Sequence, residues 1–249
     1  MIFLFWGFIA TAQQHDLHIV FIGNSITHGA GLQHPDQDAP PVKAGQFLNG
    51  VGRFGKVSVS NQGHSGYTTL DFLPGTSTYR KVQQAAHTFG SENALLVFSI
   101  MLGTNDSAIK GPHGAPVNTV DYRQNLKMII DSLLNEFPEC VVIINHPLWY
   151  SPNTYNGAQY LQEGLDRLQS YLPVIDDLVG EYKVEHQHVF LGDTKAFSYF
   201  RRKHLTDFQA EQGHQGIFYL HPNAKGAEML GQFWAKAIEK CIKRNRLMN

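Results

Sequence analysis

Residues 18–29 (HIVFIGNSITHG) contain the stretch from which the fold can be inferred. The apolar run at 18–22 is typical of a buried β-strand, and residues 23–25 (GNS) form a turn at its end. In open α/β sheets, ligands bind in the crevice outside the carboxyl ends of the strands. Ser25 is therefore a candidate nucleophile, although a lone Gly-x-Ser is more often a turn whose serine bonds its own backbone.

The rest of the chain alternates between apolar strands and amphipathic helices. Strands are predicted at 56–60, 94–102, 141–145 and 189–191, and helices at 38–52, 79–89, 122–137, 160–182 (broken near Pro173) and 223–243. We expect the polar residues 195–216 to be irregular. This alternation predicts a three-layer α/β/α fold, with a parallel sheet covered by helices on both faces. Residues 13–249 are predicted to form a single domain.

Composition restricts the classes of function. The chain of 249 residues has a formal net charge of −1 and no basic run, so it lacks the electrostatic footprint of a nucleic-acid-binding protein. Neither the two cysteines, Cys140 and Cys241, nor any pair of the 13 histidines has the spacing of a zinc site. We therefore expect two buried free thiols, no metal and no cofactor.

The first residues have a composition of their own. Residues 2–9 (IFLFWGFI) are apolar and uncharged, and residues 10–12 (ATA) match a signal-peptide cleavage site. The alternatives are a buried strand or an N-terminal anchor, but a helix that spans a bilayer needs about 20 apolar residues. We expect residues 1–12 to be a signal peptide, the protein to be secreted or periplasmic, and the mature chain not to insert into membranes.

Four polar positions lie where strands end or the last helix begins. Ser25, Gly63 and Asn105 follow the first three strands, and His221 precedes the last helix. Pro222 suits the first helical position, and the helix dipole there favours the neutral imidazole that a general base needs. We predict that Ser25 is the nucleophile and His221 the base. The expected oxyanion hole consists of the N–H groups of Ser25 and Gly63 and the amide of Asn105.

These positions lie in segments that resemble the motif blocks of the SGNH (GDSL-like) hydrolases. The segments are GNS at 23–25, NQG at 61–63, GTND at 103–106 and HPN at 221–223. The resemblance covers nearly the whole chain after residue 12 and implies a flavodoxin-like sheet of five parallel strands. It also implies a metal-independent esterase mechanism through an acyl-enzyme on Ser25. Asn24, where the family usually has Asp, and Asp106 are expected to brace their turns.

The chain departs from the family at the group that orients the histidine. The family has an Asp three residues before it, whereas this chain has Phe218. The orienting group must therefore be a backbone carbonyl or a carboxylate of the preceding loop. Glu211 is our candidate acid and Asp207 the other nearby carboxylate; for each, a solvated loop charge is the alternative.

Further side chains are candidates for contact with substrate. His28, His64 and His113 lie in or near the expected pocket loops, and residues 201–203 (RRK) read most simply as a solvated face. His146, Trp149 and Tyr150 follow the fourth strand, where aromatic rings either stack on a sugar or pack under a loop.

We predict a secreted serine esterase that hydrolyses O-acyl, preferably O-acetyl, esters of a small molecule or glycan. The carbohydrate preference rests on the resemblance to secreted family members with the GNSIT and HPN variants and on the loop aromatics. One alternative is a lipid or thioester acylhydrolase, which would need a broad apolar groove. Another is a catalytically silent glycan-binding module, supported only by the missing Asp before His221.

Overall fold

The computed structural model describes residues 14–89, 94–111, 113–185, 188–245 and 247–248. Its centre is a five-stranded parallel sheet in the order β2-β1-β3-β4-β5. The strands are β1 (Asp16–Gly23), β2 (Val57–Gly63), β3 (Ala94–Met101), β4 (Val141–Ile144) and β5 (Val189–Leu191). The five-stranded parallel sheet of the prediction is therefore confirmed. The predicted signal peptide, residues 1–12, lies outside the described residues.

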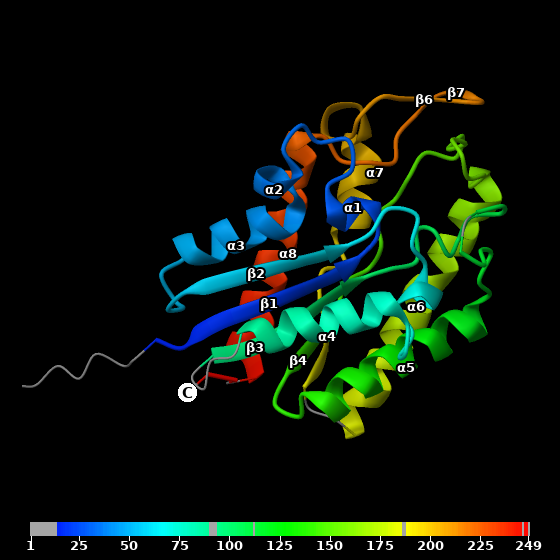
Figure 1. Ribbon diagram of the computed structural model, residues 1–249. Coiled ribbons are helices and arrows are strands. Elements are labelled where there is room, and N and C mark those ends of the chain that lie inside the picture. Colours follow the sequence, from blue (N-terminus) through cyan, green and yellow to red (C-terminus); the bar gives the residue numbers. More distant parts are fainter. Residues whose placement is uncertain (1–13, 90–93, 112, 186–187, 246, 249) are drawn as a thin grey trace, which may run out of the picture.

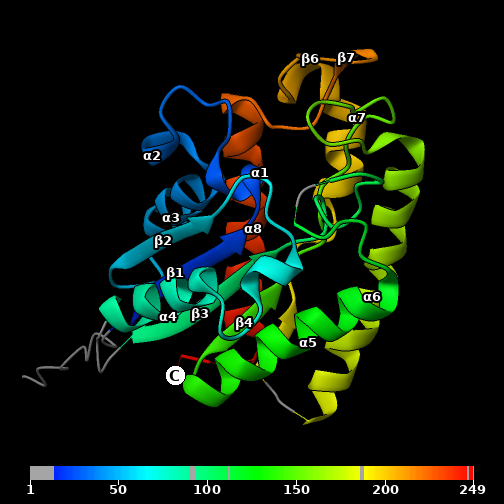
Figure 2. The same ribbon diagram turned by 45° about the vertical axis from the view of Figure 1, so that its right-hand side comes forward.

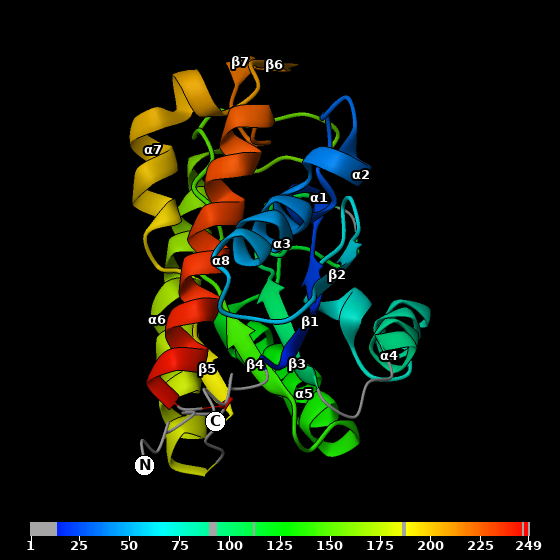
Figure 3. The same ribbon diagram turned by 90° about the vertical axis from the view of Figure 1, so that its left-hand side faces the viewer.

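Helices cover both faces of this sheet and give the molecule three layers (Figure 1). On one face α3 (Pro40–Gly50) packs against α8 (Ala224–Asn245), and α4 (Ser77–Phe89) and α5 (Thr119–Glu136) lie on the other, as Figure 3 shows. The long helix α6 (Leu161–Glu185) packs against α5 and β5 (Figure 2). Among the described residues, no helix combines the length and the apolarity needed to cross a bilayer.

The smaller elements gather beyond the carboxyl ends of the strands (Figure 1). They are α1 (Ser25–His28), α2 (Pro35–Asp38), the 3-10 helix η1 (Thr69–Phe72), α7 (Ala196–Asp207) and the hairpin of β6 (Glu211–Gly213) and β7 (Gly216–Phe218). The region 195–216 is thus ordered, and the expectation of an irregular stretch is wrong. Its regularity comes from tertiary packing, because Phe197 and Phe200 bury one face of a helix that is otherwise polar.

The expected break in α6 is also wrong. The helix continues from Leu161 to Glu185 with Pro173 inside it. Proline removes one backbone hydrogen bond, but the buried side chains of Leu168, Tyr171, Ile175 and Leu178 anchor both halves to the core. Packing therefore offsets the lost hydrogen bond, and the helix continues through the proline.

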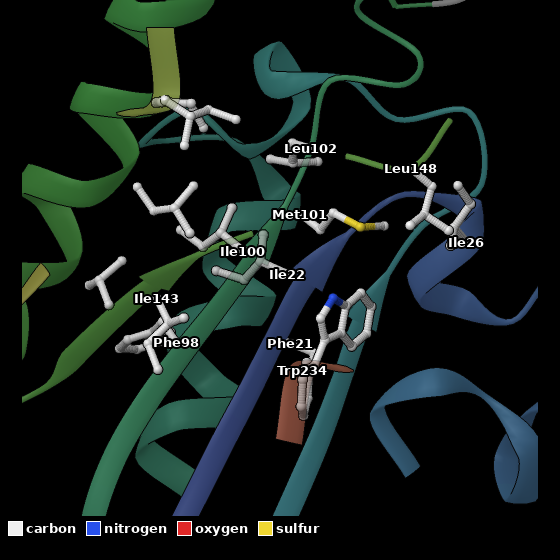
Figure 4. Close-up of a cluster of buried hydrophobic side chains, with 14 of the residues drawn as sticks. Phe21, Ile22, Ile26, Phe98, Ile100, Met101, Leu102, Ile143, Leu148 and Trp234 are labelled. Carbon is white, nitrogen blue, oxygen red and sulfur yellow. The ribbon is translucent and has the colours of Figure 1, made fainter. Parts of the chain in front are cut away.

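The core explains why the central strands are apolar on both faces. All residues of β1 from Leu17 to Gly23 are buried, as expected for a parallel strand with helices on each side. Figure 4 shows Phe21 of β1 beside Trp234 of α8, and their ring centroids are 5.4 Å apart. Ile26 and Leu148 belong to the same buried cluster, which therefore extends to the carboxyl ends of the strands. The polar side chains at this edge of the sheet therefore lie next to closely packed hydrophobic side chains.

The strand order determines where a site can form. The chain passes from β1 to β2 on one side and then crosses to β3 on the other, so the topological switch point lies between β1 and β3. Gly23 at the end of β1 is in register with Gly63 of β2 and Met101 of β3. Ser25, Gly63 and Asn105 therefore come to one edge of the sheet, the edge that also carries the β6–β7 hairpin (Figure 1).

Candidate active site

Ser25 is the first residue of α1, directly after the tight turn that ends β1. A Cβ atom at Gly23 would lie 2.0 Å from Thr27 Oγ1, so this turn requires glycine. The Asn24 side chain accepts a hydrogen bond from the Ile26 N–H at 3.0 Å, which confirms that it braces the turn. The Ser25 N–H opens the helix and has no acceptor within it.

A chain of hydrogen bonds connects Ser25 to a carboxylate. His221 Nε2 lies 2.9 Å from Ser25 Oγ, and His221 Nδ1 lies 2.9 and 3.0 Å from the two carboxylate oxygens of Glu211. A carboxylate can only accept, so the imidazole proton sits on Nδ1 and Nε2 is left as an acceptor for the Ser25 hydroxyl. The His221 N–H also donates to Glu211 Oε1 at 3.1 Å. The imidazole is thereby held in the tautomer and orientation of a general base for Ser25.

The hairpin explains how Glu211 reaches the histidine. Glu211 on β6 pairs directly with Phe218 on β7, the position at which the family has its Asp. The carboxylate thus comes from β6, whereas the family's Asp would lie on the partner strand β7. The hairpin is fixed to the loop after β4, because Asn153 Nδ2 donates to the Ile217 carbonyl at 2.8 Å and the His214 N–H donates to the Tyr155 carbonyl at 2.8 Å.

Asp207, the other carboxylate considered from the sequence, serves a different purpose. It is fully buried and receives hydrogen bonds of 2.7 Å from the Tyr199 hydroxyl, the Thr206 hydroxyl and Lys225 Nζ. These contacts join the end of α7 to the start of α8. Asp207 therefore stabilises the segment that precedes His221 and does not contact the imidazole.

The Asn105 side chain is buried at the end of β3 and is held at both ends of its amide. Its Nδ2 donates to the Tyr67 carbonyl at 2.7 Å, and its Oδ1 accepts from the Tyr160 hydroxyl at 2.7 Å. The neighbouring Asp106 Oδ1 accepts from the Thr69 N–H at 2.9 Å and from the Thr69 hydroxyl at 2.5 Å. Asp106 thus braces this turn, as the sequence predicts.

Gly63 lies at the expected edge of the sheet, but its N–H forms a hydrogen bond that the sequence did not predict. Its N–H donates to Asn61 Oδ1 at 2.9 Å, and Asn61 Nδ2 donates to the Thr27 carbonyl at 2.9 Å. A Cβ atom at Gly63 would lie 2.3 Å from the His28 backbone nitrogen, so glycine is needed for α1 to approach β2. The Gly63 N–H is therefore already engaged by the Asn61 side chain.

A cleft of about 540 Å³ opens above these groups and has Ser25, Asn105 and His221 in its walls. Among the described residues, Leu220 is the one large aliphatic side chain in the walls, and most of the others are small or polar. These others are Ala30, Ser65, Gly66, Lys110, Gly111, Asn156, Gly157, Ala158 and Tyr160. A larger cavity of about 790 Å³ lies at the amino ends of β3, β4 and β5, at the opposite edge of the sheet. It contains none of the predicted site residues.

Other expected substrate contacts are not in the walls of this cleft. His28, His64 and His113 do not line it, and His113 instead pairs with Asp71, its Nδ1 lying 2.7 Å from the carboxylate. The possibility that residues 149–150 stack on a sugar is contradicted, because Trp149 packs against His204 and Phe208 and the Tyr150 hydroxyl is hydrogen bonded to Ser107 within the core.

The structure also places the other residues that were considered from the sequence. His146 Nε2 lies 2.8 Å from the Asp176 carboxylate. As predicted, residues 201–203 are exposed on α7, and Cys140 and Cys241 are buried free thiols. Burial raises the pKa of the Cys140 thiol to about 12. Within the described part of the chain, no three His, Cys, Asp or Glu side chains cluster as metal ligands would.

Sequence reasoning missed Tyr160, Tyr67 and Asn61, which form hydrogen bonds to Asn105 and Gly63, two of the residues predicted for the oxyanion hole. Asn61 lies in the NQG segment at 61–63, and an asparagine side chain often accepts a hydrogen bond from the backbone N–H two residues later. The spacing of Asn61 to Gly63 could therefore have predicted this turn. The carbonyl of Tyr67 and the hydroxyl of Tyr160 act from loops that are distant in sequence, and no local pattern marks them.

Asp106 gives the structure a testable pH dependence. Burial raises its pKa from 3.8 to about 6, while the bonds from Thr69 oppose the shift; no described residue donates to its Oδ2. Because the folded pKa exceeds the unfolded pKa, the folded state holds this proton more tightly, so the free energy of unfolding falls as pH rises from about 4 to 6. The expected loss is about 3 kcal/mol, from about 1.4 kcal/mol for each pKa unit.

The variant Asp106→Asn isolates this contribution. Its amide oxygen can still accept from Thr69, but it does not ionise. Urea unfolding at pH 4 and pH 8 should therefore show a smaller fall in stability for Asp106→Asn than for the wild-type protein. Parallel stability curves for the two proteins would contradict the raised pKa.

The fold and the site can now be compared with known proteins. The model of the GDSL-like Lipase/Acylhydrolase family matches residues 21–229. A search of curated protein sequences gives no match. Among solved structures, the lipase/acylhydrolase from Enterococcus faecalis is similar, with a TM-score of 0.60, 19% identity, and coverage of 90% of this chain and 95% of that chain.

Two further solved structures have the same fold. One is a family 3 carbohydrate esterase from Clostridium thermocellum, with a TM-score of 0.61, 15% identity, and coverage of 92% of this chain and 98% of that chain. The other is an acetyl esterase solved with an acetate ion, with a TM-score of 0.57, 16% identity, and coverage of 92% and 98%. At these identities the similarity establishes the fold.

A parallel α/β sheet with a polar cleft at its switch point, together with the family match, defines a carboxylic ester hydrolase. The chain belongs to the GDSL-like lipase/acylhydrolase family. The resemblance of its four motif segments to the SGNH hydrolases is thereby confirmed.

Proposed function

We propose that this esterase hydrolyses O-acetyl esters of carbohydrates, with Ser25, His221 and Glu211 as its catalytic triad. The observation that supports the proposal best is the continuous chain of hydrogen bonds from the Glu211 carboxylate through His221 to the Ser25 hydroxyl. This chain ends in the 540 Å³ cleft, whose walls also include Asn105. A binding module has no need of such an arrangement.

The triad performs acyl transfer in two steps. Ser25 Oγ attacks the acyl carbon while His221 Nε2 takes the hydroxyl proton, and Glu211 stabilises the imidazolium that forms. The proton then passes to the departing alcohol oxygen as the C–O bond breaks, which leaves the acyl group on Ser25. In the second step His221 removes a proton from water, and the resulting hydroxide attacks the acyl carbon. As the bond between that carbon and Ser25 Oγ breaks, His221 returns the proton to Oγ, and the carboxylic acid is released.

The oxyanion of each tetrahedral intermediate needs hydrogen-bond donors. We assign this role to the Ser25 N–H, the Asn105 Nδ2 and the Gly63 N–H. The Ser25 N–H has no acceptor within α1, and Asn105 Nδ2 has a second hydrogen beside the one that it gives to Tyr67. The Gly63 N–H would have to be shared between the oxyanion and Asn61 Oδ1.

The walls of the cleft favour a short acyl group. A long acyl chain gains roughly 0.8 kcal/mol for each CH₂ that it buries against apolar surface. Of the wall residues that the structure describes, Leu220 is the one large aliphatic side chain, and most others are small or polar. The solved carbohydrate esterase and acetyl esterase with the same fold are consistent with acetate and carbohydrate as the two parts of the ester.

Acyl preference can be measured with p-nitrophenyl acetate, butyrate and octanoate, followed by acetate release from a partly O-acetylated oligosaccharide. We expect kcat/KM to fall steeply from acetate to octanoate, and acetate to be released from the oligosaccharide. A preference for octanoate would contradict the acetylesterase proposal and favour a lipid or thioester acylhydrolase.

We also propose that the enzyme acts outside the cytoplasm on a glycan or small-molecule ester, without nucleic acid and without insertion of the mature chain into a membrane. The apolar run at 2–9 and the small residues at 10–12 support export. Sequencing the amino terminus of the protein after secretion should give Gln13 as the first residue. Retention of Met1 would contradict the proposal.

A further inference from the structure

Tyr160 is the last residue before α6, and its ring stands in the wall of the cleft. The side chain is 4% exposed, and its hydroxyl donates to Asn105 Oδ1 at 2.7 Å. The two residues are 55 positions apart in the sequence, so the fold has to bring them together. No motif segment contains Tyr160, and the mechanism above does not use it.

Together with the hydrogen bond to the Tyr67 carbonyl, this hydrogen bond holds the Asn105 amide in one orientation. The carbonyl of Tyr67 can only accept a hydrogen bond, so it must face the NH₂ group of Asn105. The oxygen of the amide accepts only, so it must face a donor, and the Tyr160 hydroxyl is that donor. With one hydrogen on Tyr67 and the oxygen on Tyr160, the second hydrogen of Nδ2 is free for the oxyanion.

The backbone around Tyr160 is built to hold this hydroxyl in place. The N–H groups of Tyr160 and Leu161 both donate to the Thr154 carbonyl at 3.2 Å. Leu161 has a φ of +53°, a left-handed conformation that is costly for a side chain of its kind and that persists only where the surroundings impose it. The Tyr160 ring also packs edge-on against Tyr150, with ring centroids 5.3 Å apart. These contacts leave the Tyr160 ring little freedom.

We infer that Tyr160 is a positioning residue, whose hydroxyl locks the Asn105 amide with an N–H directed at the oxyanion of the transition state. This inference rests on the proposed function, in which Asn105 is an oxyanion donor. A donor held in advance needs no reorganisation during the reaction, which is the basis of its effect on rate. Charge withdrawn from Oδ1 by the Tyr160 hydroxyl also strengthens the N–H groups at the other end of the amide.

The variant Tyr160→Phe tests this inference with little change in shape. We expect kcat on p-nitrophenyl acetate to fall by about 10- to 100-fold, less than the loss on removing an oxyanion donor outright. KM should change little, because the lost interaction acts in the transition state. Tyr150→Phe is the matched control, since it removes the buried hydrogen bond to Ser107 but keeps the aromatic ring that packs against Tyr160; its kcat should stay near that of the wild-type enzyme.

A double-mutant cycle with Asn105→Ala separates positioning from general destabilisation. Asn105→Ala alone should lower kcat, and adding Tyr160→Phe to it should have little further effect. Equal losses from Tyr160→Phe in both backgrounds would overturn the inference while leaving the proposed function intact. An unchanged kcat in Asn105→Ala would instead count against the proposed oxyanion hole itself.

Amide NMR gives a readout that does not depend on activity or on global stability. The two side-chain amide protons of Asn105 should shift in Tyr160→Phe and stay in place in Tyr150→Phe. Unchanged Asn105 resonances in a folded Tyr160→Phe protein would overturn the inference.

Discussion

Ser25→Ala is expected to lower kcat for acetate esters by about 10⁵- to 10⁶-fold, as for the loss of the nucleophile in other serine hydrolases. Without the hydroxyl no acyl-enzyme can form, and the residual rate comes from the oxyanion donors and from binding alone. The fold should be preserved, because the Asn24 cap and the backbone hydrogen bonds hold α1 and do not involve the Ser25 hydroxyl, which is hydrogen bonded to His221.

Ser65→Ala is the matched control, because Ser65 lines the same cleft and has no part in the proposed chemistry. Its kcat for p-nitrophenyl acetate should remain close to that of the wild-type enzyme. Substantial hydrolysis by purified Ser25→Ala would contradict the role of Ser25 as nucleophile, provided that circular dichroism shows both variants to be folded.

Glu211→Gln is expected to lower kcat by about 10³- to 10⁴-fold with little change in KM, as for the orienting acid of other triads. The glutamine amide oxygen can still accept from the His221 N–H, so the local geometry is largely kept. The substitution removes the negative charge that stabilises the imidazolium. It also allows the imidazole to adopt the other tautomer, with the proton on Nε2, because the glutamine NH₂ group can donate to Nδ1. The loss should therefore appear in kcat.

The comparison variant for this experiment is Asp207→Asn. Asp207 is buried and hydrogen bonded to Lys225 but does not contact the imidazole. The variant should therefore lower the melting temperature while kcat stays close to that of the wild-type enzyme. A near-wild-type kcat in Glu211→Gln would show that the carboxylate is dispensable and would contradict its place in the triad.

The sequence was sufficient to predict the sheet and the convergence of Ser25, Asn105 and His221 for a specific physical reason. Ser25, Asn105 and His221 each lie next to the end of a strand or the start of a helix that hydrophobic periodicity reveals. Parallel topology then brings these ends to one edge, so their convergence follows from the order of the elements.

Positions that depend on register or on loop packing could not be assigned in the same way. The sequence alone could not decide between Glu211 and Asp207 as the acid that orients His221. What places the Glu211 carboxylate at the histidine is the pairing of Glu211 with Phe218, which only the folded hairpin reveals. The two glycines that flank the turn, Gly213 and Gly216, were a signal of this hairpin. Trp149 and Tyr160 both follow β4 in irregular segments. No periodicity in the sequence indicated that Trp149 packs in the core whereas Tyr160 lines the cleft.

Covalent labelling tests the nucleophile most directly. The wild-type enzyme, Ser25→Ala and Ser65→Ala would each be treated with a fluorophosphonate, which phosphonylates activated serines, and the modified peptide would be identified by mass spectrometry. We expect one label per molecule on Ser25 in the wild-type enzyme and in Ser65→Ala, and none in Ser25→Ala. Equal labelling of Ser25→Ala, or a label on another residue of the wild-type enzyme, would contradict the assignment of Ser25 as the catalytic nucleophile.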